Sequence, residues 1–209
     1  MKKIPTAGKV KGGVKPKSTK NVEIVGVSGA VGSFSEEAGQ TYLRELGLKN
    51  YRLEYLVTIE NTIAAIEAGK VSLAVFPVQN STMGIVPEAV DAMGRHNFRV
   101  EQIFSIDVHQ NLLVKKGVTK NQIKKIVSQD PAIKQCAMYL ARKWKGTPLG
   151  EYADTAQAAK DLSTGKLPPT TAVIASRAAA RAYKLDILEP SIQDLQSNAT
   201  TFIAARRLV

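Results

Sequence analysis

Short apolar runs rich in β-branched residues alternate with helix-like segments along this chain from residue 21 onward. Val22–Val27, Tyr51–Val57 and Val71–Phe76 have the composition of strands, and helices are expected between them at Ser35–Leu46 and Ile59–Ala68. The alternation continues with a helix after Pro87, extended segments at Arg99–Ile106 and Asn111–Val114, strands at Ile126–Ser128, Leu149–Tyr152, Thr171–Ala175 and Thr201–Ala205, and helices at Pro131–Trp144, Thr155–Ser163 and Arg177–Tyr183. This spacing is typical of βα units, so the sequence predicts an α/β fold.

Most of the net excess of positive charge lies at the N-terminus. The formal net charge is +11, and residues 1–20 contain seven lysines and no acid. That segment has too little apolar surface to offset the entropy of ordering it, so residues 1–20 are predicted to be a disordered basic tail. The tail has no aromatic residue that could stack on a base, and the remaining chain carries little excess charge, so no nucleic-acid partner is expected.

Cysteine usage and hydropathy favour a cytoplasmic protein. Cys136 is the one cysteine among 209 residues, so no internal disulfide can form. No apolar stretch approaches the ~18 residues that a membrane span requires, and no apolar core follows the N-terminal lysines as it would in a secretory signal. We therefore expect a cytoplasmic location and no membrane contact.

Polar side chains cluster where predicted strands end. Pro77 is expected to end the ladder of the strand before it, which would leave Gln79, Asn80 and Ser81 free to face a crevice. A polar turn before the next helix is the alternative. Similar groups occur elsewhere, with helix caps and turns as the alternatives: Ser128–Pro131 with Gln135, Asp154–Thr155, and Asn198–Phe202. Four clusters of neutral amides and hydroxyls favour a small ligand that bears carboxylates and hydroxyls.

A loop with two glycines, Gly29–Ser33, precedes the first predicted helix. Its spacing does not match a dinucleotide-binding fingerprint. The backbone amides of Gly32, Ser33 and Phe34 would lie at the positive end of that helix, where they could receive a substrate carboxylate. A tight turn that needs glycine for backbone reasons alone is the alternative.

Several kinds of catalytic centre are missing from the sequence. His96 and His109 are the only histidines and lack metal-ligand spacing, so neither a metal nor another cofactor is expected. The sequence contains no nucleophile elbow and no P-loop. Cys136 has only amides around it, and we expect it to be a small buried residue on an apolar helix face.

Four motifs occur in the order and spacing of one enzyme family. Gly29–Ser35 is similar to Gly-Pro-x-Gly-Thr-Phe-Ser, and Val75–Gly84 is similar to Val-Val-Pro-Ile-Glu-Asn-Ser-x-x-Gly. Ser128–Cys136 follows Ser-His-Pro-Gln-Ala-Leu-x-Gln-Cys, and Ile192–Phe202 follows Ile-x-Asp and Asn-x-Thr-Arg-Phe. From about residue 21 to residue 206 the chain thus resembles the catalytic domain of the prephenate dehydratase family.

The resemblance implies both a fold and an activity. It implies two α/β lobes arranged like a type II periplasmic binding protein, with the active site in the cleft between them, and a homodimer. Residues 21–103 with 187–209 would form one lobe, and residues 104–186 the other. The family converts prephenate, a dicarboxylate, to phenylpyruvate, CO2 and water in phenylalanine biosynthesis. Because the chain stops at Val209, the family's C-terminal regulatory domain is expected to be absent.

Position by position, the resemblance makes Thr200 the catalytic residue. A threonine hydroxyl can donate a hydrogen bond to the departing ring oxygen as negative charge develops there. The residues expected to bind the substrate around it are Asn80, Ser81, Ser128, Gln135, Thr155, Thr201 and Phe202, with a carboxylate held by Gly32, Ser33 and Phe34.

The chain departs from the family motifs at four charged or titratable positions. The arginine after the catalytic threonine is Thr201, the glutamate before the motif asparagine is Gln79, and two histidine positions are Gln110 and Gln129. We hypothesise that the glutamate and arginine balance each other in the cleft, so that losing both avoids stranding a buried charge. Three functions remain open: prephenate dehydratase, a retuned decarboxylase of a related cyclohexadienyl acid, and a non-catalytic module that binds small carboxylates.

Overall fold

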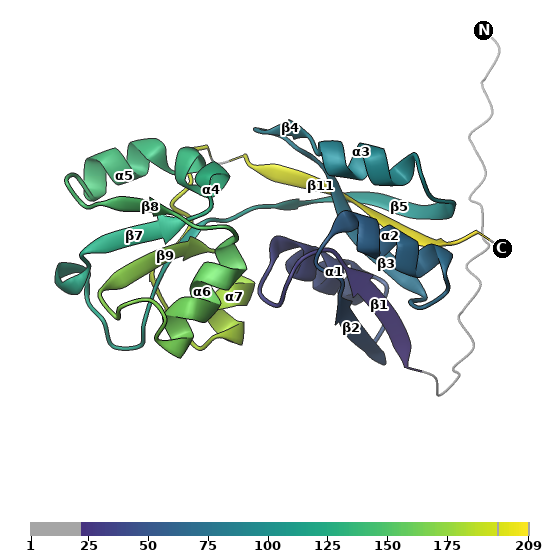
Figure 1. Ribbon diagram of the computed structural model, residues 1–209, viewed down its shortest axis with the longest axis horizontal. Helices are drawn as coiled ribbons and strands as arrows, with labels where there is room; N and C mark the ends of the chain where they lie inside the picture. The colour runs from purple at the N-terminus through teal and green to yellow at the C-terminus, as the bar shows by residue number, and fades with distance from the viewer. Residues whose placement is uncertain (1–21, 196, 209) are drawn as a thin grey trace, which may run out of the picture.

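The computed structural model describes residues 22–195 and 197–208. The predicted tail at residues 1–20 lies outside the described residues. Two lobes lie side by side, each built on its own sheet with helices on both faces (Figure 1). The prediction of a two-lobed α/β fold is therefore confirmed.

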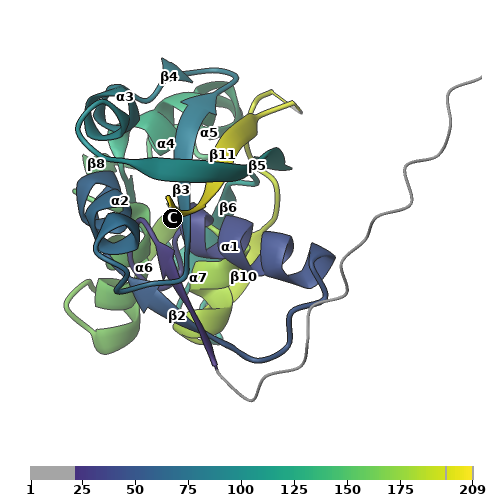
Figure 2. The ribbon, with the colours of Figure 1, turned by 90° about the vertical axis from the view of Figure 1, so that its right-hand side faces the viewer.

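The first lobe is a six-stranded sheet covered by three helices. Its strands follow the order β2 (Tyr51–Tyr55), β1 (Glu23–Val27), β3 (Leu73–Asn80), β11 (Ala199–Arg207) and β5 (Phe98–Asp107), with β4 (Gly84–Ile85) paired to the end of β3. Strand β1 runs parallel to both neighbours, whereas β11 is antiparallel to β3 and β5. Two helices, α2 (Ile59–Glu67) and α3 (Pro87–Met93), lie on one side of this sheet and α1 (Phe34–Glu45) on the other (Figure 2).

The first half of strand β3, Leu73–Phe76, is buried on both faces, which explains its continuous apolar sequence. Ala74 and Phe76 pack into the core beneath α2 and α3, while Leu73 and Val75 pack against α1. All four side chains are fully buried. Because side chains alternate between the faces of a strand, a strand covered on both sides must be apolar at every position.

The second lobe is a five-stranded sheet covered by four helices. Its strands follow the order β10 (Asp186–Glu189), β6 (Asn111–Val114), β9 (Thr171–Ala175), β7 (Lys125–Ser128) and β8 (Leu149–Glu151). Helices α4 (Asp130–Gln135) and α5 (Ala137–Lys143) cover one face, and α6 (Thr155–Thr164) and α7 (Arg177–Ala182) cover the other. A short 3-10 helix, η1 (Lys120–Gln122), precedes β7.

The chain changes lobes twice, after β5 and before β11. Strand β5 stays in the first sheet as far as Asp107, and β10 stays in the second sheet as far as Glu189, each a few residues beyond the expected boundaries. The two connecting segments lead from one lobe to the other (Figure 1). Because β11 returns to the first sheet between β3 and β5, the residues just before it and at its start lie where the lobes meet.

Pro77 does not end its strand as the sequence suggested. Strand β3 continues through Pro77 to Asn80. Strand β1 pairs with β3 only as far as Val75, and the register of β11 shifts by one residue between Thr201 and Phe202. Pro77 thus occupies a bulged part of the ladder, where the missing N–H of a proline is tolerated.

The single helix predicted at residues 131–144 is two helices, α4 and α5, that meet at Cys136. The Asp194 carboxylate accepts hydrogen bonds from the backbone N–H groups of Met138 and Tyr139, both at 2.8 Å. The Asp194 backbone N–H in turn donates to the carbonyl of Gln135 at 2.8 Å. Asp194, almost sixty positions along the chain, thus supplies hydrogen-bond partners to backbone groups on both sides of the break, which a continuous helix would pair internally.

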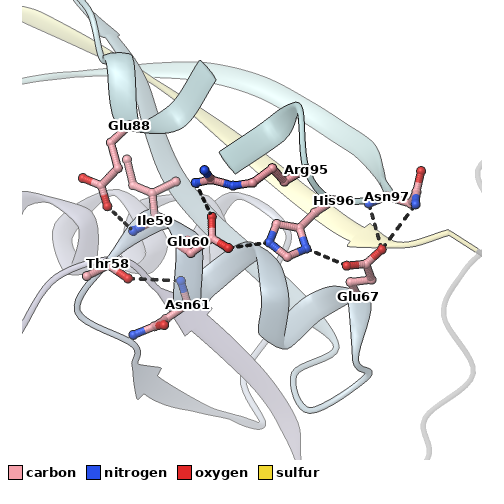
Figure 3. A network of polar contacts seen from close by, with 9 residues as sticks. All are labelled: Thr58, Ile59, Glu60, Asn61, Glu67, Glu88, Arg95, His96 and Asn97. Atoms are coloured by element: carbon pink, nitrogen blue, oxygen red, sulfur yellow. Dashed lines mark hydrogen bonds and ion pairs between the residues drawn. The ribbon is translucent and has the colours of Figure 1, made fainter. Parts of the chain in front are cut away.

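His96 joins helix α2 to the loop that follows α3. Its Nε2 lies 2.8 Å from Glu60 Oε1 and its Nδ1 lies 2.6 Å from Glu67 Oε2 (Figure 3). Arg95 adds an ion pair to Glu60 at 2.9 Å, and the Asn97 backbone N–H donates to Glu67 at 3.0 Å. The hydrogen bonds to Glu67 and then Glu60 raise the pKa of His96 above its usual value.

We expect the stability of the first lobe to fall as the pH rises through the raised pKa of His96. A group whose pKa is raised by folding stabilises the fold fully below its ordinary pKa of about 6.5, and that contribution is lost above its folded pKa. The melting temperature of the wild type should therefore decrease from pH 6 toward alkaline pH more steeply than that of His96→Gln. Glu67→Gln should flatten the profile as well, and parallel profiles for all three proteins would contradict the assignment.

Candidate active site

A cavity of about 160 Å³ lies between the lobes. The first lobe contributes Phe34 from α1, Asn80 from β3 and Thr200 from β11, and the second contributes Gln135 from α4 and Thr155 from α6. The lining is completed by Val108, Gln110, Gln129, Pro131 and Ala132. None of the described residues that line this cavity carries a side chain that titrates near neutral pH.

A larger groove of about 320 Å³ adjoins the cavity at Gln135. Met83, Met138 and Leu195 make its surface mainly apolar, and Lys134 lies at its side. The groove lacks both Thr200 and Asn80, so the smaller cavity is the better candidate for chemistry.

Thr200 and Asn80 face each other across the pair of strands β11 and β3. The Asn80 Nδ2 group donates a hydrogen bond to Thr200 Oγ1 at 2.8 Å. Since the hydroxyl oxygen accepts this bond, its own proton remains available to a ligand. Thr200 is only 9% exposed, so a hydrogen bond from its hydroxyl would act in a nearly dry environment.

Backbone N–H groups fix the orientation of the Asn80 side chain. Its Oδ1 accepts from the N–H groups of Thr82 and Met83, both at 3.0 Å. Its Nδ2 must therefore be the atom that faces Thr200 and the Oδ1 of Asn198, which lies 3.0 Å away. Asn80 thus positions the hydroxyl of Thr200.

The amide chain continues into the second lobe. Asn198 Nδ2 donates to Gln135 Oε1 at 3.0 Å, and Gln110 Nε2 donates to the same oxygen at 3.0 Å. Asn198 and Gln110 lie in or beside the two segments that connect the lobes, and Gln135 lies at the end of α4. A continuous chain of side-chain amides therefore links the two lobes beside the cavity.

The structure brings together five of the residues that the resemblance assigned to the site. Phe34, Asn80, Gln135, Thr155 and Thr200 all line the cavity. Asn80, Thr155 and Thr200 were expected at the ends of strands or helices. The fold places those ends in one cleft because the two lobes face each other.

Three other expected residues do not line the cavity. Ser128 is fully buried, and its hydroxyl donates to the carbonyl of Ile174 at 2.7 Å. Ser81 Oγ accepts from the backbone N–H of Ala199 at 3.0 Å. Phe202 is buried in the core beneath α1, with its ring centroid 6.0 Å from that of Phe104. Their contacts are with the protein's own backbone and core.

The loop before α1 is already satisfied within the protein. The Gly32 backbone N–H donates to Glu36 Oε2 at 2.6 Å, and the Ser33 N–H donates to the carbonyl of Ala30 at 3.1 Å. Ser33 Oγ accepts from the Glu36 N–H at 3.2 Å, which caps the helix. The backbone N–H of Gly32 is therefore occupied by the Glu36 carboxylate and that of Ser33 by the Ala30 carbonyl, so neither is free to receive the expected substrate carboxylate.

Gly32 is instead required by contact between the lobes. Its carbonyl accepts a hydrogen bond from Ser176 Oγ at 2.6 Å, and its φ is +84°. A Cβ at this position would lie 2.8 Å from the Cα of Ala179 on α7. The loop thus needs glycine both for its backbone conformation and for close approach to the second lobe.

Thr201 lies on the face of β11 opposite to Thr200. It pairs with Gln79 on β3 and with Ser105 on β5, and its hydroxyl lies 3.0 Å from Ser105 Oγ. Neither Thr201 nor Gln79 lines the cavity. The two positions that are charged in the family motifs are therefore cross-strand neighbours, but neither lines the cavity in which the hypothesis placed them.

We expect Thr201→Arg to leave the kcat/KM for prephenate within about threefold of the wild-type value, because the side chain at this position faces away from the cavity. Steady-state kinetics on the purified variant would check this. A loss or gain of tenfold or more would show that Thr201 contacts the ligand after all.

Cys136 is fully buried, as predicted, and burial raises the pKa of its thiol to about 12. It is therefore protonated at neutral pH and has no nucleophilic character.

Within residues 22–195 and 197–208, no group of three or more potential ligands is arranged to hold a metal ion. No helix in the described part of the chain is long and apolar enough to cross a bilayer.

The family model of prephenate dehydratase matches residues 25–207, which is nearly the whole described chain. The chain belongs to the prephenate dehydratase family. An arogenate dehydratase/prephenate dehydratase of Arabidopsis thaliana is 32% identical over 184 residues, which cover 88% of this chain and 43% of that relative. A prephenate dehydratase of Methanocaldococcus jannaschii is 30% identical over 173 residues, which cover 82% and 60% of the two chains. This member of the family thus spans about half the length of these curated relatives.

A solved structure supports the same fold. The prephenate dehydratase from Arthrobacter aurescens, in complex with L-Phe, superposes with a TM-score of 0.79 at 22% identity. The match covers 89% of this chain and 61% of that one. This prephenate dehydratase family member therefore shares its two-lobed α/β fold with a solved prephenate dehydratase, as the resemblance implied.

Proposed function

We propose that this chain is a dehydratase of the prephenate type, which converts prephenate to phenylpyruvate, CO2 and water. The observation that carries the proposal is the hydroxyl of Thr200, which lines the inter-lobe cavity with its oxygen held by Asn80. Membership of the family supports the reaction class, and the lack of titratable groups among the described lining residues restricts the catalyst to neutral hydrogen-bond donors.

The substrate supplies most of the driving force. As the bond from the ring to its hydroxyl breaks, the oxygen leaves with the bonding electrons, and the ring carboxylate leaves as CO2. The electron pair from the broken carbon–carbon bond enters the ring and makes it aromatic. One net proton taken up from the buffered solution converts the departing hydroxide to water, so that the prephenate dianion and a proton give the phenylpyruvate monoanion, CO2 and water. The protein has only to orient the ring and stabilise the charge that develops on the leaving oxygen.

Thr200 is proposed to donate its hydrogen bond to that leaving oxygen. Gln135 and Thr155 offer donors from the second lobe, and Phe34 offers an apolar surface for the ring. Closing the lobes around the substrate would remove water from the ring carboxylate and favour its loss.

We also propose that the protein is a cytoplasmic homodimer. The family resemblance supports the dimer, and the buried lone cysteine supports the cytoplasmic location.

Incubation of the purified chain with prephenate tests the function. The expected result is the absorbance of phenylpyruvate in base, together with the aromatic proton signals of that product by NMR. Loss of CO2 with retention of the ring hydroxyl would show a decarboxylase instead. Thermal stabilisation by prephenate without turnover would show a binding module, and either outcome would overturn the proposal.

A further inference from the structure

The two lobes carry net charges of opposite sign. Residues 108–190, which form the second lobe, contain fourteen lysines and arginines and six acids, a formal net charge of +8. Residues 22–107 and 191–208 contain eight lysines and arginines and twelve acids, a net charge of −4. The expectation of no nucleic-acid partner rested partly on the small net charge after residue 20, which conceals this division between a basic and an acidic lobe.

The topology of the second sheet brings lysines together at one end. The register places the end of β6 beside the start of β10, and the starts of β7, β8 and β9 beside one another. Lysines occupy the chain at this end of all five strands, and we call these eight residues the lysine end: Lys115 and Lys116 after β6, Lys124 and Lys125 at the start of β7, and Lys143, Lys145, Lys166 and Lys184 in the segments that lead into β8, β9 and β10.

The lysine end is separate from the cavity. Gln110, Gln129 and Thr155, which line the cavity, lie at the opposite ends of β6, β7 and β8. The lysine end points away from the first lobe (Figure 1). A partner bound there would therefore not touch the proposed active site.

Little negative charge neutralises the lysine end. Seven of its eight side chains are exposed, and Lys115 is half-buried. Among the described residues, only Lys166 of the eight has an ion pair, with its Nζ 3.4 Å from Asp161 Oδ1. Asp186 is the exposed acid at this end, and its carboxylate accepts from the backbone N–H of Gly117 at 3.0 Å. Crowded, unpaired cations of this kind attract an anionic partner.

The other side chains at the lysine end restrict the kind of anion. None of the described aromatic side chains is exposed, and Lys120 Nζ covers the ring of Trp144 at 4.9 Å from its centroid. Without exposed rings, this end cannot stack on the bases of a single strand. Leu149 is the one large apolar side chain exposed nearby, whereas stable binding to a membrane requires an apolar element in addition to charge.

We infer that the lysine end binds the phosphate backbone of double-stranded nucleic acid without reading its sequence. Charge alone supplies non-specific binding to a duplex, and a lysine contacts a phosphate as a point charge. Five strand ends about 4.8 Å apart span about 19 Å, over which a duplex presents about eleven phosphate charges. The inference is independent of the proposed dehydratase function.

Fluorescence anisotropy of the full chain with labelled DNA and RNA duplexes tests the inference. We expect a Kd between about 1 and 100 μM at physiological salt, with affinity falling steeply as salt is raised. Duplexes of unrelated sequence should bind equally. Replacing four lysines together, Lys116→Gln, Lys124→Gln, Lys143→Gln and Lys145→Gln, should raise Kd by about tenfold or more and reduce the slope of log K against log salt by about 3 to 4.

The matched control removes the same charge from the N-terminal segment. Lys9→Gln, Lys11→Gln, Lys15→Gln and Lys17→Gln together should change Kd by less than about threefold, although the net charge of the chain falls equally. Both variants should keep the wild-type melting temperature, because the substituted side chains at the lysine end are exposed and unpaired.

Three kinds of result would overturn the inference. The first is no binding to either duplex at low salt, or binding that does not depend on salt. The second is an equal loss of affinity in the two fourfold variants. The third is binding to another partner in place of the duplex: phosphatidylserine vesicles would assign the lysine end to a membrane, and salt-dependent self-association would assign it to the acidic first lobe of a second copy. Turnover of prephenate bears on the proposed function alone.

Discussion

Replacing Thr200 with valine is expected to lower kcat by about 100-fold or more while KM changes little. Valine preserves the shape of the side chain but removes the hydroxyl that we place against the leaving oxygen. Asn80 Nδ2 still has Asn198 Oδ1 as an acceptor at 3.0 Å, so the amide chain should survive the change. Initial rates with prephenate, together with the melting temperature, would measure the effect.

Thr200→Ser is the matched control. It keeps the hydroxyl, and we expect it to retain kcat within about tenfold of the wild type, since only the methyl group is lost. If Thr200→Val and Thr200→Ser lost activity equally, the hydroxyl would not be the functional group at this position.

Asn80→Asp is expected to lower kcat by about 10- to 100-fold and also to lower the melting temperature, because one carboxylate oxygen would face the acceptor Asn198 Oδ1, 3.0 Å from the replaced Nδ2. One carboxylate oxygen can still accept from the N–H groups of Thr82 and Met83. The other oxygen replaces the Nδ2 donor, so the Thr200 hydroxyl would donate to the carboxylate and turn its proton away from the ligand.

The expected loss of kcat without loss of folding distinguishes positioning from a structural role. Circular dichroism and thermal melting should show a folded protein, while single-turnover kinetics should show the slower chemical step. An unchanged kcat in Asn80→Asp would mean that the orientation of the Thr200 hydroxyl does not depend on Asn80.

Much of the fold followed from local patterns. The first half of strand β3 and nearly all of β9 are apolar because helices cover both faces of their sheets, and this composition is visible in the sequence. Strands β4 and β10 carried no such signal, since β4 has two exposed residues and β10 is only partly buried. The break at Cys136 depends on the Asp194 carboxylate, so no local pattern could have revealed it.

The site was predicted in part. Thr200 and Asn80 belong to motifs at the ends of paired strands, so they were expected in the cleft and both line it. Thr201 and Phe202 belong to the same motif, but strand alternation and the bulge direct them elsewhere. Gln110 was noted only as a departure from a family histidine, because the chain of amides to which it belongs exists only in the folded protein.

The central claim is that neutral hydroxyl and amide groups, held between two lobes, carry out the elimination. The pH dependence of kcat with prephenate tests this claim most directly, since none of the described lining residues titrates near neutral pH. We expect kcat to stay constant within about twofold from pH 6.5 to 9. A bell-shaped profile, or a single limb with a pKa inside that range, would show that an acid or base takes part and would contradict the account.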